Sequence, residues 1–290
     1  MTPVPTRPIH IVDELIHERA PRLAASGFWP VIRPALYGLL GYQKAVAMAD
    51  HIADHSGEAA LAYISRLLSL ETIAHGLTRL PKTGRCVVVC NHPTGIADGV
   101  AVYDAIRRIR QDAIFFANAD ALRVCPRLGE SVIPVEWVEA KRTREKTRAT
   151  LLAARDAFEA ERCVVLFPAG RLARLNREGV LTDPPWATTA VSLAQKYKAP
   201  VVPVHITGPY AFWFHSFNKI SKELRDVTLF HELLNKAGKR YELKVGPVIP
   251  AEDLTSETGG PDTGDLCDQL KAYVERQLPK NADKPFKAVL

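Results

Sequence analysis

Short apolar runs alternate with amphipathic segments along most of the chain, and this alternation constrains the fold more than any other feature. Each apolar run has the length of a buried strand, and the intervening segments show helical periodicity. The apolar runs cover 86–90, 113–117, 132–135, 163–167 and 200–207, and the helical segments cover 97–110, 142–161 and 186–198. This order predicts an α/β fold with a mostly parallel central sheet flanked by helices.

Both ends of the chain extend this pattern. Residues 35–69 predict two helices interrupted near Ser56-Gly57, whereas 241–249 and 265–278 predict a further strand and a closing helix. We therefore expect an N-terminal helical segment at 1–69 and an α/β domain at 70–290. Because parallel sheets bind ligands at the carboxyl ends of their strands, the residues that follow each strand are the first candidates for a functional site.

The composition excludes several classes of protein. With 290 residues, of which 47% are hydrophobic and 24% charged, the chain resembles globular proteins and not disordered or fibrous ones. Its five cysteines are scattered without a CxxC pair, which argues against a structural zinc site and a secreted disulfide framework. Residues 1–16 lack the features of a signal peptide, so we expect a cytoplasmic protein.

The net charge of +6 comes from residues 81–290, which carry 31 basic and 25 acidic side chains. A surplus of this size suits an anionic small substrate or a membrane face. No helix-turn-helix or zinc-finger pattern accompanies the basic residues, so we expect no nucleic acid partner.

Residues 28–40 form an aromatic-rich segment in which Arg33 is the only charge. A membrane-spanning helix is disfavoured by Pro30, by Pro34 and by Arg33, since an arginine at mid-bilayer costs about 3 kcal/mol. Attachment to the membrane interface and burial against the protein's own core both remain open, and we expect interfacial attachment.

The strongest candidate for chemistry follows the first buried strand, in the sequence Asn91-His-Pro-Thr-Gly-Ile-Ala-Asp98. A histidine at a strand end, followed by a turn and an aspartate entering a helix, allows the carboxylate to fold back onto the imidazole. An Asp bonded to one ring nitrogen fixes the tautomer and makes the other nitrogen a base for an alcohol proton. The alternative interpretation is that Asp98 only caps the helix and His92 is a packed turn residue.

Two further strand ends carry candidate residues. Phe167-Pro-Ala-Gly-Arg171 opens a loop whose backbone can approach a ligand closely, and Arg171 can contact a phosphate or carboxylate. A βα loop with a surface arginine is the alternative. At 201–208, Pro203 within an apolar run predicts a bulge or an edge strand.

These three strand ends, in this order and spacing, resemble the glycerolipid acyltransferase family over roughly residues 70–250. That family includes the acylglycerol-phosphate and lysophospholipid acyltransferases, and residues 224–249 resemble its hemolysin-like or lyso-ornithine-lipid branch. The resemblance implies that His92 is the general base and Asp98 its orienting carboxylate. It further implies substrate contacts from the same two loops, at Asn91, Thr94, Gly95, Phe167, Pro168, Gly170 and Arg171.

The chain departs from the family pattern at two positions. Five residues separate His92 from Asp98 where the family usually has four, and Ala169 stands where the commoner form has glutamate. The missing carboxylate leaves Arg171 to hold the acceptor headgroup, alone or with other bases. Arg142 and Arg144 are candidates for this role or for contacting the phosphates of coenzyme A, although a solvated helix face is the alternative.

The function implied by the resemblance is transfer of a fatty acyl group from acyl-CoA or acyl carrier protein to the free hydroxyl of a lysolipid of the 1-acylglycerol-3-phosphate type. We expect no metal and no bound cofactor, and a peripheral location on the inner face of the membrane. One alternative is a lyso-ornithine lipid O-acyltransferase. The other is a non-catalytic protein of the same fold that binds lipid or acyl-CoA.

Two further clusters remain open at this stage. His51 and His55 lie four residues apart beside acidic residues, but no third metal ligand is evident, which favours a solvated helix face. The aromatic residues of 210–217 suit a core, an acyl tunnel or a lipid contact.

Overall fold

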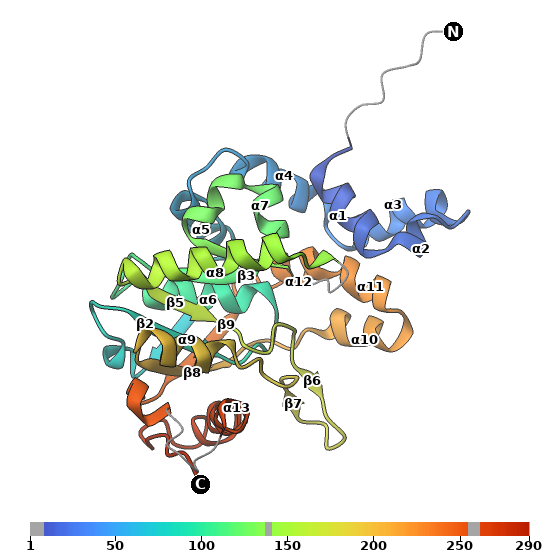
Figure 1. The fold of residues 1–290 in the computed structure, drawn as a ribbon. Coiled ribbons are helices and arrows are strands. Elements are labelled where there is room, and N and C mark those ends of the chain that lie inside the picture. Colours follow the sequence, from blue (N-terminus) through green and yellow to red (C-terminus); the bar gives the residue numbers. More distant parts are fainter. Residues whose placement is uncertain (1–8, 137–140, 255–261, 290) are drawn as a thin grey trace.

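A seven-stranded sheet forms the centre of the molecule (Figure 1). The computed structural model describes residues 9–136, 141–254 and 262–289. Neighbouring strands are parallel except for the β8–β9 pair, which confirms the mostly parallel sheet. In spatial order the strands are β1 (Glu71–His75), β9 (Arg240–Val245), β8 (Val201–Thr207), β2 (Cys86–Cys90), β5 (Cys163–Leu166), β3 (Ile114–Asn118) and β4 (Val132–Val135).

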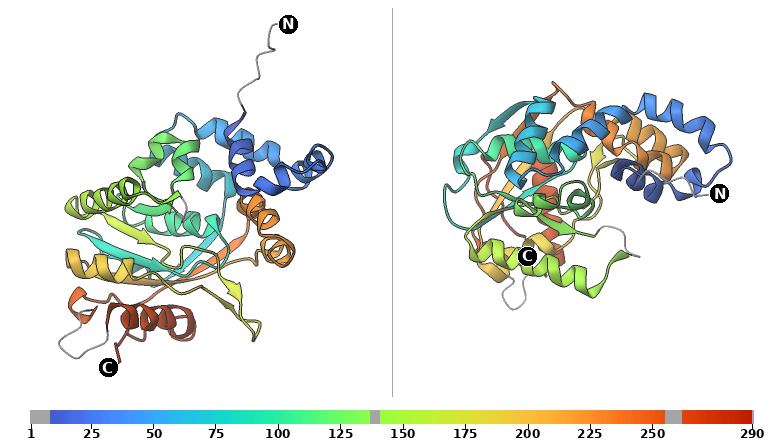
Figure 2. Two further views of the ribbon diagram at one scale, coloured as in Figure 1. Left: turned by 45° about the vertical axis from the view of Figure 1, so that its right-hand side comes forward. Right: turned by 90° about the horizontal axis from the view of Figure 1, so that it is seen from above.

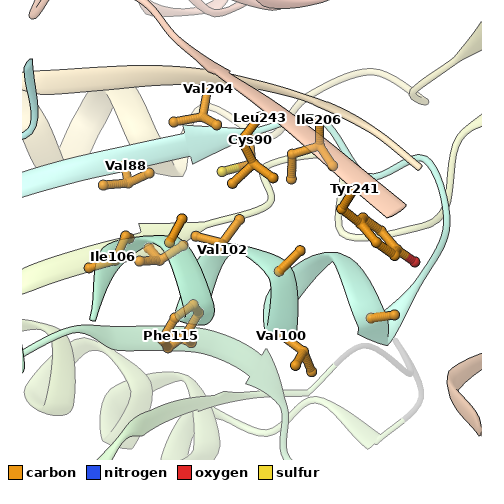
Figure 3. Packing of buried hydrophobic residues seen from close by; sticks show 14 of the residues in the cluster. Val88, Cys90, Val100, Val102, Ile106, Phe115, Val204, Ile206, Tyr241 and Leu243 are labelled. Atoms are coloured by element: carbon orange, nitrogen blue, oxygen red, sulfur yellow. The ribbon is translucent and has the colours of Figure 1, made fainter. Parts of the chain in front are cut away.

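Helices cover both faces of this sheet (Figure 2). One face packs on α5 (Gly57–Leu68) and α6 (Ile96–Ile106), and the other packs on α8 (Arg144–Glu159), α9 (Thr189–Tyr197) and α13 (Thr263–Ala272). β2 shows the period of two that a buried strand requires: Cys86, Val88 and Cys90 join the α6 cluster, whereas Val87 and Val89 join the cluster under α8 and α9. Figure 3 shows Val88 and Cys90 facing Val102 and Ile106 of α6.

A second group of helices lies to one side of the sheet (Figure 1). Helices from both halves of the chain share its apolar cluster, because Val227 packs with Val12, Trp29 and Leu36. The group comprises α1 (Ile11–Arg19), α2 (Pro21–Ala24), α3 (Trp29–Leu39), α4 (Tyr42–Ile52), α10 (Phe212–Ile220), α11 (Lys222–Val227) and α12 (Leu229–Leu234).

The remaining short elements connect these layers. They are the hairpin β6 (Arg174–Leu175) and β7 (Leu181–Thr182), the helix α7 (Asp120–Val124), and the single turns Leu77–Arg79, Pro126–Glu130, Ala251–Leu254 and Tyr273–Gln277. The hairpin and α10 extend toward the same side of the molecule as α3 (Figures 1 and 2).

The region expected to hold two helices, 35–69, contains the end of one helix and two more. The break falls where predicted: Ser56 begins α5, and its hydroxyl accepts a hydrogen bond from the Ala59 N–H at 3.2 Å. The sequence pattern missed the second break, at Gly41, whose φ of +68° lets the chain turn between α3 and α4. Residues of α4 and α5 pack in the same cluster as β2, so these helices share a core with the sheet.

Segment 28–40 is amphipathic in the structure. Trp29 and Leu36 face the core, whereas Phe28 and Val31 keep 75% and 76% of their surface exposed. Among the described residues, no helix is long and apolar enough to cross a membrane.

Pro203 does not mark an edge strand, because β8 lies between β9 and β2 inside the sheet. The structure shows the bulge instead. Val201 pairs with Ile249 and Val204 with Val245, so the partner strand carries one extra residue between these pairs. Pro203 sits opposite this interruption, where its carbonyl accepts a hydrogen bond from Gly246 and its missing N–H breaks no regular ladder.

Candidate active site

The turn after β2 starts with a link between two strands. The Asn91 side chain donates to the Ile206 carbonyl at 3.0 Å, and its oxygen accepts from the Ile206 N–H at 2.6 Å. Both bonds are buried, so they fix the carboxyl end of β2 to β8. The side-chain amide of Asn91 is thus engaged with the main chain and holds the following histidine in place.

His92 and Asp98 meet as the sequence predicts. The ring Nδ1 of His92 lies 2.9 Å from Asp98 Oδ2, and the Asp98 side chain is fully buried at the third residue of α6. Because a carboxylate only accepts, Nδ1 carries the hydrogen and Nε2 is left with its lone pair. Within the described part of the chain Nε2 has no hydrogen-bond partner, and the His92 side chain remains 17% exposed.

Three more donors point at the same carboxylate. Asp98 accepts from the Thr94 N–H at 2.9 Å, the Thr94 hydroxyl at 2.6 Å and the Gly95 N–H at 3.0 Å. Four hydrogen bonds therefore hold Asp98 in one orientation and compensate for its burial.

The longer spacing between His92 and Asp98 is accommodated at Gly95. Its φ of +111° is a conformation that L side chains rarely adopt, and an added Cβ would lie 3.3 Å from Leu172 Cδ2. Leu172 belongs to the loop after β5, so the extra residue of the turn is packed directly against the second predicted motif.

Tyr241 closes the turn from the far end of the chain. Its hydroxyl lies 2.7 Å from Thr94 Oγ1, and the ring is fully buried. Burial and the nearby charge of Asp98 raise the pKa of Tyr241 above its usual range, so the phenol stays protonated. Since Thr94 donates to Asp98, Tyr241 donates to Thr94; Figure 3 shows its hydroxyl directed toward the start of α6.

The loop after β5 lies against His92. The Phe167 ring packs on the imidazole with a centroid distance of 4.7 Å, and Pro168 is buried behind it. Gly170 turns the chain with a φ of +60°, and the Ala173 N–H then donates to the His92 carbonyl at 2.8 Å. The structure thus brings together the two motifs that are 75 residues apart in the sequence.

Arg171 is exposed beside two further cations that the sequence analysis did not select. The pKa of Arg174 is lowered from its usual value by burial and by the charges of Arg225 and Arg171. Arg225 also contacts Asp226 at 2.7 Å and lies over the Phe214 ring. This arrangement makes the edge of the site electropositive.

Arg142 and Arg144 lie elsewhere. Both are exposed, and they precede or begin α8, the helix that follows edge strand β4. Two strands separate β4 from β2, which at the usual strand spacing places it about 14 Å away. Arg142 donates to the Glu136 carbonyl at 3.0 Å, and neither arginine contacts His92.

Asp183 is the buried residue of the site that sequence reasoning missed. It follows β7, is 4% exposed, and accepts from the His92 N–H at 3.0 Å. Tyr241 was missed as well. Each partner lies far along the chain, at separations of 91 and 147 residues, so no local pattern identifies it.

The paired histidines and the cysteines do not form a metal site in the described ranges. No group of three or more His, Cys, Asp or Glu side chains suited to a metal occurs there. His51 instead stacks on Tyr63 with a centroid distance of 4.0 Å, and the five cysteines are free and buried. In the aromatic cluster Phe214 is buried, whereas Phe212 is 61% exposed.

The structure brings the His92–Asp98 pair beside the Phe167–Arg171 loop, and these are the two motifs on which the resemblance to an acyltransferase family rests. Residues 71–207 match the protein family described as Acyltransferase, and this match, with the relatives described next, supports the glycerolipid acyltransferase superfamily.

Known proteins that are similar to this chain carry acyltransferase names. The chain is 28% identical over 181 residues to a lyso-glycine lipid O-acyltransferase of Phocaeicola vulgatus, covering 60% of this chain and 63% of that protein. The enzyme of the same name from Bacteroides thetaiotaomicron is 24% identical over 225 residues, covering 73% and 80%. The match thus spans less than two thirds of the first relative. The 1-acyl-sn-glycerophosphate acyltransferase of Thermotoga maritima shares the fold, with a TM-score of 0.50 and 14% identity over 96% of this chain and 99% of that one.

Proposed function

We propose that this protein is a lysolipid O-acyltransferase that uses an acyl thioester as donor. The observation that carries the proposal is the 2.9 Å contact of His92 Nδ1 with buried Asp98, which leaves Nε2 as a base at the carboxyl end of β2. An oriented imidazole of this kind suits proton transfer from an alcohol.

The reaction follows from this geometry. His92 Nε2 takes the proton from the acceptor hydroxyl as its oxygen attacks the thioester carbonyl, and the C–S bond then breaks. The imidazolium returns the proton to the leaving thiolate, so the products are an ester and a thiol. Backbone N–H groups of the loops after β2 and β5 stabilise the oxyanion. The thioester supplies the driving force, so the step needs no metal and no bound cofactor.

An anionic headgroup on the acceptor suits the site. Arg171 and Arg174 offer guanidinium groups to a carboxylate or phosphate near His92, and Arg225 adds positive potential. Lyso-glycine lipid is the first acceptor to test, because two relatives carry it in their names. Lysophosphatidic acid and lyso-ornithine lipid are the alternatives, and Ala169 is compatible with an acceptor other than a phosphate.

The donor is acyl-CoA or acyl carrier protein. Arg142 and Arg144 are exposed at the start of α8, on the far edge of the sheet from β2. Their position suits contact with a long donor, either the phosphates of coenzyme A or the acidic surface of a carrier protein, better than contact with the acceptor.

A peripheral location on the inner face of the membrane fits the exposed apolar residues. On α3, Val31 and Leu39 are 76% and 52% exposed, and on α10, Phe212 and Ile220 are 61% and 72% exposed. Both helices lie on the side of the molecule toward which the β6–β7 hairpin extends (Figures 1 and 2). Such a surface enters the headgroup region without spanning the bilayer.

Acyl transfer is tested by following thiol release from palmitoyl-CoA and from palmitoyl carrier protein. Lyso-glycine lipid, lysophosphatidic acid and lyso-ornithine lipid are supplied separately, with mass spectrometry of the ester product. We expect acceptor-dependent release that His92→Ala abolishes. A folded wild-type protein that is silent with every pair but binds acyl-CoA would overturn the proposal and support the non-catalytic alternative.

Membrane attachment is tested by co-sedimentation with vesicles containing anionic lipid. Val31→Asp combined with Phe212→Asp should reduce the bound fraction about tenfold, because two exposed apolar side chains that would insert into the headgroup region are lost. Leu151→Asp is the matched control, since Leu151 is 55% exposed on α8. Equal losses in both variants would contradict a membrane face at α3 and α10.

A further inference from the structure

The main chain of His92 is held from both ends of the β6–β7 hairpin. Ala173, directly before β6, donates its N–H to the His92 carbonyl at 2.8 Å. Asp183, directly after β7, accepts the His92 N–H with Oδ1 at 3.0 Å and Oδ2 at 3.2 Å. Hydrogen bonds therefore hold both the main-chain N–H and the main-chain carbonyl of His92, the proposed base.

Asp183 is itself held firmly. Its Oδ2 accepts from the Trp186 indole N–H at 2.9 Å, and its own N–H donates to Glu275 Oε1 at 2.6 Å. Trp186 is buried among the residues under α9, and Glu275 pairs with Lys271 at 2.6 Å. The carboxylate thus has one available orientation, with both oxygens within hydrogen-bond distance of the His92 N–H.

Burying a carboxylate to accept a main-chain N–H costs more free energy than burying a neutral acceptor. A neutral side chain can accept a main-chain N–H, whereas an ionised group with 4% exposure is strongly desolvated. The negative charge has a specific use here, because His92 becomes positively charged when it takes a proton. Asp98 faces the ring of His92 and Asp183 faces its main chain, so two carboxylates flank the imidazolium.

We propose that Asp183 is a positioning residue of the active site, which orients His92 through its main-chain N–H and stabilises the imidazolium with its charge. This inference rests on the proposed role of His92 as the general base. Asp183 is 4% exposed and contacts the His92 main chain, so we expect it to act on turnover and to leave substrate affinity unchanged.

The proposal gives a characteristic pH dependence. Burial is the largest cause that raises the pKa of Asp183 to about 6, with a smaller contribution from Glu275, while the bonds from Trp186 and His92 and the His92 charge oppose the shift. Cys90 is the other titratable neighbour, and burial keeps its thiol protonated by raising its pKa well above the usual value. Below about pH 6 Asp183 takes up a proton and its negative charge is lost, so kcat/KM should fall on the acid side as Asp183 titrates.

The first experiment measures this profile between pH 4.5 and about 8.5 for wild type, Asp183→Asn and Trp186→Phe. In Asp183→Asn the part of the acid limb that reports Asp183 is absent, because the titrating carboxyl group is gone. At its pH optimum kcat falls on the order of 10- to 100-fold, while both KM values stay within about twofold. Asparagine cannot accept hydrogen bonds from both Trp186 and His92 as aspartate does, because an NH₂ group replaces one of the two acceptor oxygens.

Trp186→Phe is the matched control. It removes the indole N–H that donates to the same carboxylate and leaves the contact with the His92 main-chain N–H in place. The bond from Trp186 lowers the pKa of Asp183, so its loss moves the Asp183 titration in the acid limb to higher pH without abolishing it. If Trp186→Phe and Asp183→Asn gave the same profile and the same kcat, Asp183 would be supporting the loop only.

A second measurement does not depend on activity. In ¹⁵N-labelled protein the main-chain amide signal of His92 should shift as Asp183 titrates near pH 6, and this shift should be absent in Asp183→Asn. This titration tests the proposal even if Asp183→Asn does not fold, because the shift of the His92 amide signal is measured in the wild-type protein. If the amide signal shifts but the protein transfers no acyl group, the contact between Asp183 and His92 stands and the proposed function is rejected. An amide that does not respond, or an unchanged kcat and pH profile in folded Asp183→Asn, would overturn the role of Asp183.

Discussion

The turns after β2 and β5 end neighbouring parallel strands, yet their polar groups are used in opposite ways. In the first turn Asp98 is fully buried and accepts four hydrogen bonds from its own turn. In the second, Arg171 is exposed, and among the described residues it has no hydrogen-bond or ion-pair partner. The groups that would perform the proton transfer are fixed before substrate arrives, whereas the group that would recognise the headgroup is left for the substrate to engage.

This difference follows from the chemistry of the two tasks. Proton transfer requires an atom held within a few tenths of an ångström, and a closed set of hydrogen bonds supplies such precision. Recognition of a charged headgroup requires a cation whose bonding capacity is not already used by the protein. Mutations in the two turns should therefore fail in different ways.

The largest effect is expected at the centre of the first turn. His92→Ala removes the proposed base, so kcat should fall on the order of 10³-fold, with little change in the free energy of unfolding. Steady-state thiol release with a fixed acceptor provides the measurement. His51→Ala, at a histidine stacked on Tyr63, is the control and should retain activity. Substantial turnover in His92→Ala would remove the first turn from the chemistry altogether.

Asp98→Asn should reduce kcat on the order of 10²- to 10³-fold and also destabilise the fold. Asparagine cannot accept all four hydrogen bonds, so the imidazole loses its fixed tautomer and a buried donor is left unpaired. Urea unfolding should show a loss of about 1–3 kcal/mol. Full activity in a destabilised variant would show that Asp98 only supports the turn, as a helix cap does.

Arg171→Ala should act on binding and not on stability. The KM for the acceptor should rise about tenfold with kcat within about threefold, and Arg171→Lys should recover part of the loss. Arg177→Ala, at an exposed arginine of the hairpin tip, serves as the control. A loss confined to kcat would mean that the second turn takes part in the chemical step, and the contrast between the two turns would disappear.

Tyr241→Phe should have the smallest effect of the four. The variant loses the hydroxyl that donates to Thr94, while Thr94 keeps its bond to Asp98. We expect about 1 kcal/mol less stability and a kcat within about threefold of wild type. Activity as low as that of Asp98→Asn would show that the first turn depends on this distant support as much as on its own hydrogen bonds.

The features that the sequence predicts are those encoded within a few residues. β2 is a run of five apolar residues, and His92 and Asp98 are separated by one turn, so both are visible locally. Phe167 and Arg171 follow a buried strand directly, and the resemblance to a family motif adds their expected role. The helix boundary at Ser56 was predicted by a similar local signal, whereas the turn at Gly41 was missed because the apolar pattern continues through it.

The missed features depend on contacts between distant segments. Nothing around Asp183 distinguishes it from a surface aspartate before two prolines, and only the folded chain places it against His92. Pro203 suggested an edge because the extra residue that accommodates it lies on another strand. The basic run at Arg142 and Arg144 has a clear local signal, but the order of the strands places it away from β2.

The position of β9 has a consequence for how the protein is made. β9 pairs with both β1 and β8, so the seven-stranded sheet cannot be completed until the chain has been synthesised beyond residue 245. Tyr241 on this strand is also the residue that supports Thr94, which was synthesised 147 residues earlier. Nascent chains that stop before β9 would carry His92 and Asp98 in an open, incomplete sheet with β1 unpaired. A shortened or stalled product would therefore lack both the strand that completes the sheet and the Tyr241 hydroxyl that supports the turn after β2.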